Sequence, residues 1–146
     1  MKILIIGAGG VGTSTAAIIK RAGAGADWAT KVVISDYNEA RAKEVAESIC
    51  GGGKFVAEKI DATSPESIKE VIKKHDIEFV MNAVEPSFNQ TIFDTCLEAK
   101  VVYLDCAMTL SKPTEGAAGK EVVSAGRRVL AERRDFARSA AQGLER

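Results

Sequence analysis

Three glycines near the start of the chain have a spacing that suits a phosphate-containing ligand. Gly7, Gly9 and Gly12 form the pattern G-x-G-x-x-G, with an apolar run before it and a helix-compatible run after it. Gly7 permits a tight turn, Gly9 lets the main chain approach a pyrophosphate, and Gly12 lets the helix pack closely on the strand. The N–H groups of Gly10 and Val11, at the helix N-terminus, are expected to face the phosphates. No lysine occupies the G-K-[ST] position, so the pattern predicts a dinucleotide site rather than a triphosphate P-loop.

An acidic residue follows at the end of the next apolar run. Asp36 closes residues 31–36, where a carboxylate accepts hydrogen bonds from the hydroxyls of an adenosine ribose. A carboxylate there repels a 2′-phosphate, so the sequence predicts NAD in preference to NADP. Tyr37 stands where an arginine would favour NADP, but Arg41, one helical turn further on, keeps NADP open as the alternative. The other interpretation of Asp36 is a capping or loop-solvating group.

Two later strand ends are also candidates for the cofactor site. Asp61 and Ala62 follow the third predicted strand, where an adenine ring would rest, although Asp61 is equally suited to a capping role. Asn82, Ala83 and Val84 lie at the carboxyl end of the fourth predicted strand, the edge at which ligands bind in open parallel sheets. Their backbone is expected to border the ribose or the nicotinamide.

No catalytic set can be assembled from the remaining residues. His75 is the only histidine, and it falls in the last turn of a predicted helix, away from the carboxyl ends of the strands. Cys50, Cys96 and Cys106 form no C-x-x-C pair, and an odd number of cysteines without metal-ligand spacing indicates reduced thiols. The sequence therefore predicts no metal site and leaves the catalytic residues unknown.

Apolar, β-branched runs alternate with helical stretches up to residue 105. Predicted strands cover residues 3–6, 31–36, 54–60, 78–82 and 100–105, and predicted helices cover residues 12–22, 39–50, 65–75 and 87–99. The first strand is continuously apolar, which is typical of a strand covered on both faces, whereas the third is less apolar and is expected near the sheet edge. Such alternation predicts a doubly wound α/β (Rossmann) fold, with about five parallel strands and helices on both faces.

We expect residues 1–146 to form a single NAD(P)-binding domain, with a core at residues 1–106 and a loop followed by a long helix at residues 107–146. The chain carries 20 basic and 20 acidic residues, so its formal net charge is zero and it has no overall attraction to nucleic acid or to an anionic membrane. No apolar run approaches the length of about 20 residues that spans a bilayer. These features predict a cytoplasmic protein without nucleic-acid or membrane partners.

The strand ends together resemble those of the saccharopine dehydrogenase family over residues 1–106. In the N-terminal cofactor domain of that family the third strand ends in a D-A pair, the fourth in an N-A-x-x-P-like loop and the fifth in Y-x-D. The matching stretches here are the glycine turn, Asp61-Ala62, the segment from Asn82 to Pro86, and Tyr103-Leu104-Asp105. This combination is more specific than the glycine motif alone.

The resemblance implies an NAD(P)-dependent oxidoreductase that transfers hydride at the C–N bond of an amino-acid or polyamine derivative, of the saccharopine, lysine or carboxynorspermidine class. The family continues into a sixth strand and a second domain that binds the small-molecule substrate and supports a homodimer. Because neither follows here, we expect a truncated cofactor-binding domain that holds a nucleotide and catalyses nothing alone. The alternatives are a stand-alone NAD(H)-sensing regulatory module of similar length and a nucleotide-free scaffold with a vestigial site.

Overall fold

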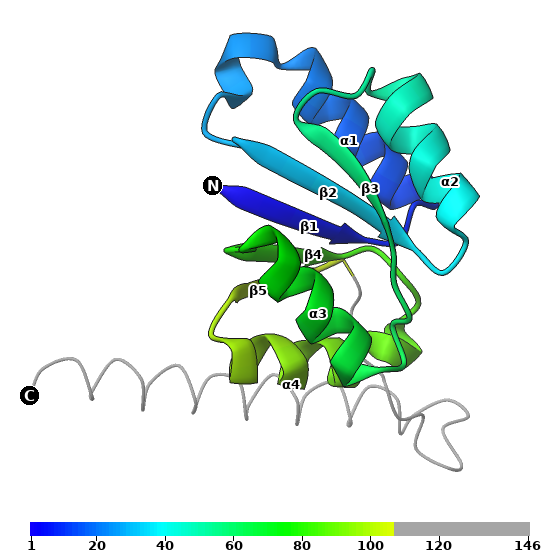
Figure 1. Ribbon diagram of the computed structural model, residues 1–146, viewed down its shortest axis with the longest axis vertical. Helices are drawn as coiled ribbons and strands as arrows, with labels where there is room; N and C mark the ends of the chain where they lie inside the picture. The colour runs from blue at the N-terminus through cyan, green and yellow to red at the C-terminus, as the bar shows by residue number, and fades with distance from the viewer. Residues whose placement is uncertain (107–146) are drawn as a thin grey trace, which may run out of the picture. The chain divides into compact units, whose positions relative to one another are not determined.

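A five-stranded parallel sheet runs through residues 1–106, the part of the chain that the structure, a computed structural model, describes (Figure 1). The strands are β1 (Lys2–Ile6), β2 (Lys31–Asp36), β3 (Phe55–Lys59), β4 (Phe79–Asn82) and β5 (Val102–Asp105). Their order is β3-β2-β1-β4-β5, so the third strand lies at an edge of the described sheet, as predicted. The predicted loop and helix of residues 107–146 lie outside the described part of the chain.

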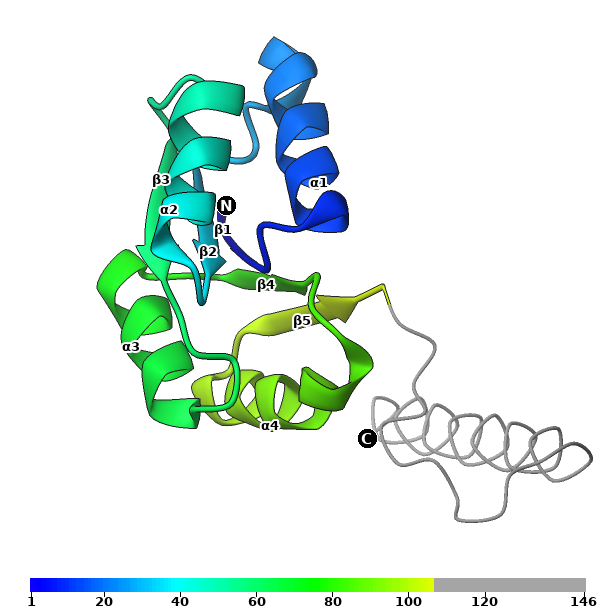
Figure 2. The same cartoon turned by 90° about the vertical axis from the view of Figure 1, so that its right-hand side faces the viewer.

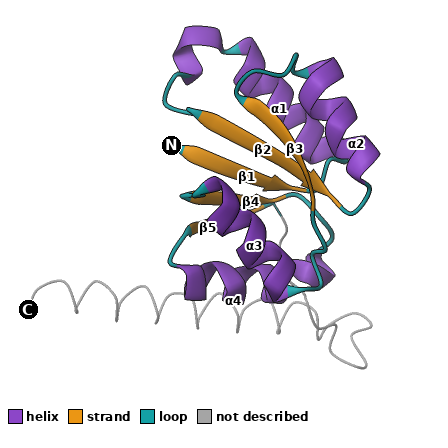
Figure 3. Ribbon diagram, in the orientation of Figure 1, coloured by secondary structure: helices purple, strands orange, loops and turns teal. Residues whose placement is uncertain are grey.

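Helices cover both faces of this sheet (Figure 2). The main helices are α1 (Gly10–Arg21), α2 (Glu39–Lys43), α3 (Pro65–His75) and α4 (Asn89–Ala99). The helices α1 and α2 pack on one face and α3 and α4 on the other, and Figure 3 shows the strands between the two helix layers. This arrangement confirms the predicted doubly wound α/β fold. No helix within residues 1–106 is long and apolar enough to cross a membrane.

The central strand β1 contributes to both halves of the core. Ile3 and Ile5 face the layer that contains α1, while Leu4 and Ile6 face α3 and α4. All four side chains are at most 4% exposed. Burial of one such side chain contributes roughly 1.5–3 kcal/mol. The continuous apolar run is therefore explained by a strand that has no solvent-facing side.

Two of the helices, α2 and α3, begin at the predicted residues, and a side chain caps the N-terminus of each. The Oδ1 atom of Asn38 accepts hydrogen bonds from the N–H groups of Ala40 and Arg41 at the start of α2. The hydroxyl oxygen of Ser64 accepts one from the N–H of Ser67, 3.2 Å away, at the start of α3. Each cap satisfies N–H groups that the first helical turn leaves without partners, so the local sequence favours a helix start at these positions.

Other helix boundaries differ from the prediction. The predicted helix of residues 39–50 is a short α-helix followed by the π-helical segment η2 (Glu44–Ile49). Val45 and Ala46, both in this π-helical segment, are fully buried in the core. Short 3-10 segments, η1 (Gly23–Ala26) and η3 (Pro86–Phe88), follow α1 and precede α4.

Candidate nucleotide-binding site

The glycine turn follows the central strand β1 and lies between the ends of the two adjacent strands, β2 and β4. Gly7 directly follows β1 and has a φ of 103°, a value that favours glycine. Its N–H donates to the carbonyl oxygen of Ser35 at 2.8 Å, on the β2 side of the turn. On the other side, the N–H of Ala83 donates to the carbonyl oxygen of Ile6 at 2.8 Å. The backbone of the turn is thus held by the ends of both adjacent strands.

The three glycines of the motif have different surroundings. A Cβ atom on Gly12 would lie 1.9 Å from the carbonyl oxygen of Gly7, so only glycine lets α1 pack this closely on the turn. A Cβ atom on Gly7 would lie 2.8 Å from Cγ1 of Val84. Gly9 has nothing within 4 Å of the position of a Cβ atom, so its main chain can be approached from outside.

The N-terminus of α1 can accept an anion. No side chain caps it, and its first turn contains no acidic residue. The N–H of Thr13 donates to the carbonyl oxygen of Gly9 at 2.9 Å, so the N–H groups of the three preceding residues lie ahead of the first intrahelical hydrogen bond. Gly10 and Val11 are exposed at this end. Free N–H groups and the helix dipole together favour a phosphate here.

Asp36 lies beside the turn and contacts it directly. Its Oδ2 atom accepts a hydrogen bond from the N–H of Ala8 at 2.8 Å, and its Oδ1 atom accepts one from the N–H of Asn38 at 2.9 Å. An ionised carboxylate has about four acceptor sites, so two backbone donors leave it able to accept from ribose hydroxyls. The loop-ordering role and the ligand role are therefore compatible.

Arg41 also contacts the turn. Its Nε atom donates to the carbonyl oxygen of Ala8 at 3.0 Å, and the hydroxyl of Thr13 donates to the same oxygen at 3.0 Å. Its Nη1 atom lies 3.2 Å from Oε2 of Glu44. A guanidinium group next to Ala8, the residue that Asp36 also contacts, bears directly on the choice between NAD and NADP.

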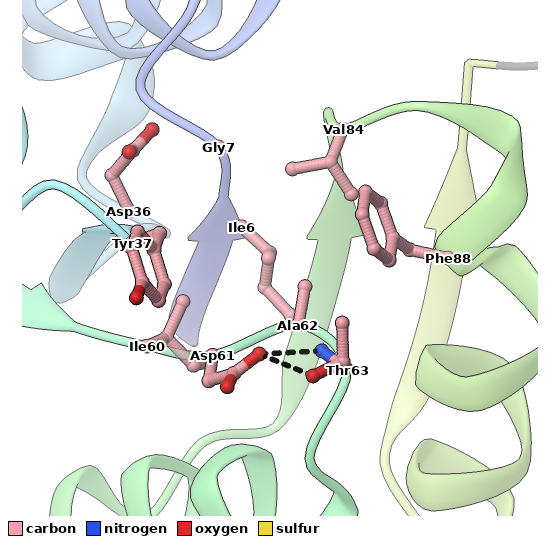
Figure 4. Close-up of a pocket in the computed structure, with 10 residues that line it drawn as sticks. All are labelled: Ile6, Gly7, Asp36, Tyr37, Ile60, Asp61, Ala62, Thr63, Val84 and Phe88. Atoms are coloured by element: carbon pink, nitrogen blue, oxygen red, sulfur yellow. Dashed lines mark hydrogen bonds between the residues drawn. The ribbon is translucent and has the colours of Figure 1, made fainter.

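A cavity of 310 Å³ opens between the strand ends (Figure 4). Its size falls within the range of small-molecule sites. The residues that line it are Ile6, Gly7, Asp36, Tyr37, Ile60, Asp61, Ala62, Thr63, Val84 and Phe88. A second, more open depression shares Gly7, Asp36, Val84 and Phe88 with this cavity and continues past Gly9, Ala83 and Glu85. The shared lining makes one extended site, which suits a long ligand that passes over the glycine turn.

The loop after β3 forms the floor of the cavity. The Oδ1 atom of Asp61 accepts hydrogen bonds from the N–H of Thr63 at 2.9 Å and from its hydroxyl at 2.6 Å. These two hydrogen bonds hold the pKa of the Asp61 carboxyl below its usual value. Asp61 therefore orders its own loop and also lines the cavity, so both interpretations of this residue apply.

The predicted site residues fall into three groups. The cavity and the open depression are lined by Gly7, Gly9, Asp36, Tyr37, Asp61, Ala62, Ala83 and Val84. The first turn of α1 contains Gly10, Val11 and Gly12. Asn82 is only 1% exposed and lies beneath the loop that follows β4. Sequence reasoning missed Ile6, Ile60 and Thr63 in the cavity and Glu85 in the open depression, although the two isoleucines could have been found as the last apolar residues of their strand runs.

The only histidine contacts neither cavity. His75 is 7% exposed, and its Nε2 atom lies 2.7 Å from Oε1 of Glu58. Nζ of Lys74 lies 2.7 Å from the same oxygen. Partial burial opposes ionisation of Glu58, but the hydrogen bonds and positive charges of Lys74 and His75 outweigh it and lower the pKa of the carboxyl below its ordinary value of 4.5. The contact joins β3 to α3 and has a structural role.

This contact predicts a loss of stability in acid. Because the pKa of Glu58 is lower in the folded protein, its contribution is present above about pH 4.5 and is lost as the pH falls through the folded-state value. We expect Glu58→Gln to lower the free energy of unfolding by about 1–2 kcal/mol at pH 7 and to flatten its decrease towards acid pH. Urea denaturation at pH 7 and in acid measures both effects. The exposed Asp27→Asn variant is the control, and equal pH dependence in Glu58→Gln and wild type would contradict the assignment.

Comparisons with known proteins identify the family. The model of the saccharopine dehydrogenase NADP binding domain matches residues 3–141. The carboxynorspermidine synthase of Vibrio cholerae is 32% identical over 123 residues, which are 80% of this chain and 29% of that protein. The carboxyaminopropylagmatine dehydrogenase of a Synechocystis strain is 27% identical over 106 residues, 73% of this chain and 25% of that protein. This chain therefore spans less than a third of either relative.

The fold also matches a solved structure. The apo saccharopine dehydrogenase (L-Glu forming) of Saccharomyces cerevisiae superposes with a TM-score of 0.59 at 17% identity, over 75% of this chain and 22% of that one. At this identity the match supports the fold alone. The family model supplies the cofactor class, NAD(P), and the glycine turn, the free helix N-terminus and the extended cavity fit such a cofactor. The chain belongs to the saccharopine dehydrogenase family, and residues 3–141 correspond to its NADP-binding domain.

Proposed function

We propose that this chain is the cofactor-binding part of a cytoplasmic NAD(P)-dependent oxidoreductase that transfers hydride at the C–N bond of an amino-acid or polyamine derivative. The names of the two relatives support a polyamine-related substrate. A bound nicotinamide supplies or accepts the hydride, and this chain contributes the binding and orientation of the cofactor. A second domain, outside this chain, would bind the substrate and support a homodimer.

The hydrogen bond between Asp36 and Ala8 is the main structural support for this proposal. The Asp36 carboxylate accepts the N–H of Ala8, the residue between the first two motif glycines, at 2.8 Å. The ribose-binding candidate and the phosphate-binding candidate are thus in direct contact and border the same cavity, as the binding of one dinucleotide requires.

We further propose that the site prefers NAD to NADP. A 2′-phosphate would place its negative charge against Asp36, which repels it. Arg41 is the opposing group, but in this structure its guanidinium already donates to Ala8 and pairs with Glu44. The free guanidinium that a 2′-phosphate would need is therefore partly occupied.

Calorimetric titration of the chain with NADH, NADPH and AMP tests both statements. We expect NADH to bind more tightly than NADPH, and AMP to bind more weakly than NADH. Asp36→Asn is expected to weaken NADH binding by about tenfold and to reduce the preference for NADH over NADPH. The reason is that one carboxylate acceptor and the negative charge are lost. Asp27→Asn, an exposed change outside the cavity, is the control.

The outcomes separate the two statements. Absence of binding of all three nucleotides would contradict the proposed cofactor domain. Tighter binding of NADPH than of NADH would be consistent with the proposed cofactor domain but would contradict the role given to Asp36.

A further inference from the structure

A chain of hydrogen bonds runs beneath the loop that follows β4. The Nδ2 atom of Asn82 donates to the hydroxyl oxygen of Tyr103 at 3.0 Å and to Oδ1 of Asn89 at 2.8 Å. Its Oδ1 atom accepts from the N–H of Val84 at 3.1 Å. The Asp105 carboxylate, at the end of the same strand, acts electrostatically on this hydroxyl. These contacts connect β5, the end of β4 and the start of α4.

The direction of each hydrogen bond in this chain is determined. The N–H of Val84 can only donate, so Asn82 must turn its oxygen towards Val84 and its amide nitrogen towards Tyr103. The amide nitrogen of Asn82 can only donate, so the hydroxyl oxygen of Tyr103 accepts this hydrogen bond. Burial raises the pKa of Tyr103 to about 12, so the hydroxyl keeps its proton at neutral pH. Hydrogen bonds that point the same way strengthen one another.

Val84, at one end of this series of hydrogen bonds, forms a wall of the cofactor site. Val84 lines both the cavity and the open depression, and its Cγ1 atom lies against the glycine turn at Gly7. Figure 4 shows Val84 and Phe88 on the side of the cavity opposite Asp36 and Tyr37. A shift of the Val84 backbone would therefore change both the width of the cavity and the space between the Val84 side chain and the glycine turn.

We propose that Tyr103 is a positioning residue of the cofactor site: its hydroxyl holds the Asn82 amide, which in turn holds the backbone of Val84 against the cavity. The inference rests on the proposed function, because it takes the cavity to be the dinucleotide site. Tyr103 itself lines neither cavity, so it acts through Asn82 and Val84. A purely structural role would instead rest on its ring, which packs edge-on against Phe93 with centroids 5.5 Å apart.

Tyr103→Phe separates the two roles because it keeps the ring and removes the hydroxyl. We expect the hydrogen-exchange rate of the Val84 amide to rise about tenfold, while the Val80 amide in the middle of β4 is unchanged. The Kd for NADH is expected to rise by about five- to twentyfold. Phe93→Leu is the matched control, since it removes the ring contact and keeps the hydroxyl; it should lower stability in urea without selective exchange at Val84.

A second variant tests the path through Asn82. Asn82→Asp keeps an acceptor for the N–H of Val84 but replaces the donor to Tyr103 with an acceptor. If Tyr103 acts through Asn82, adding Tyr103→Phe to Asn82→Asp should raise the Kd for NADH by less than twofold further. Full multiplication of the two effects would overturn the inference.

The remaining outcomes are also decisive. If wild type binds NADH and Tyr103→Phe leaves both the Kd and the Val84 exchange rate unchanged, the positioning role is wrong and the proposed function stands. Faster exchange at Val84 with an unchanged Kd would equally overturn it. If wild type binds no nucleotide, the proposed function fails and the inference fails with it.

Discussion

Replacing Gly12 with alanine is expected to lower the free energy of unfolding by roughly 3 kcal/mol and to abolish nucleotide binding. The added Cβ atom would lie 1.9 Å from the carbonyl oxygen of Gly7 and 3.2 Å from Cγ2 of Ile5. The first of these atoms belongs to the backbone next to the central strand, so it cannot move aside alone. The start of α1 must shift instead, and the helix N-terminus moves with it. Urea denaturation followed by circular dichroism, together with NADH titration, measures both effects.

Gly10→Ala is the matched control for this prediction. Gly10 is the first residue of α1, and a Cβ atom there meets nothing within 4 Å. Alanine keeps the N–H and favours the helix, so stability should be unchanged or slightly raised. Equal losses of stability in the two variants would contradict a packing cause, and so would a Gly12→Ala variant as stable as wild type.

Replacing Gly9 with valine is expected to weaken NADH binding by about a hundredfold or more, which corresponds to about 2.7 kcal/mol, while the fold is retained. The position is open, and Gly9 has a φ of −74°, which any residue can adopt. A branched side chain there would occupy the space in which a pyrophosphate meets the main chain. Valine as the helix N-cap should cost about 1 kcal/mol of stability or less.

Calorimetry and urea denaturation of the same Gly9→Val sample distinguish loss of the ligand site from loss of the fold. The Gly9→Ala variant, with a smaller side chain, should give an intermediate affinity. Unchanged NADH affinity in the valine variant would mean that the ligand does not approach Gly9. Substitutions of Gly9 and Gly12 are therefore expected to weaken NADH binding for different reasons: at Gly9 the side chain blocks the ligand, and at Gly12 it disrupts the packing of α1.

Much of the fold could be predicted from the sequence because its signals are local. The continuous apolar run of β1 required a strand covered on both faces, and the caps at Asn38 and Ser64 fixed the starts of two helices. The π-helical turn could not be predicted, because the buried residues Ala42, Val45 and Ala46 have the i, i+3, i+4 spacing of a regular α-helix. Nothing in the local sequence distinguishes that turn from a regular helix.

The site was predicted less completely, for a related reason. Asp36 and the glycine turn follow a spacing that can be read along the chain, and the structure brings them into contact. Asn82 was expected to border the ligand with its backbone, but its side chain is buried and engaged by Tyr103. That pairing joins two strands across the sheet, and the hydrogen-bond partners of a buried amide depend on tertiary contacts that no sequence period encodes.

The central place of β1 has a consequence for synthesis of the protein. Of the described strands β1 emerges from the ribosome first, and it pairs with β2 on one side and with β4 on the other. The partner of Ile3 on the β4 side is Phe79, so a nascent chain carries an apolar strand with one unpaired edge until that residue has been made. Pairing between such distant segments closes slowly. We therefore expect nascent chains that end before β4 to be the species most dependent on chaperones.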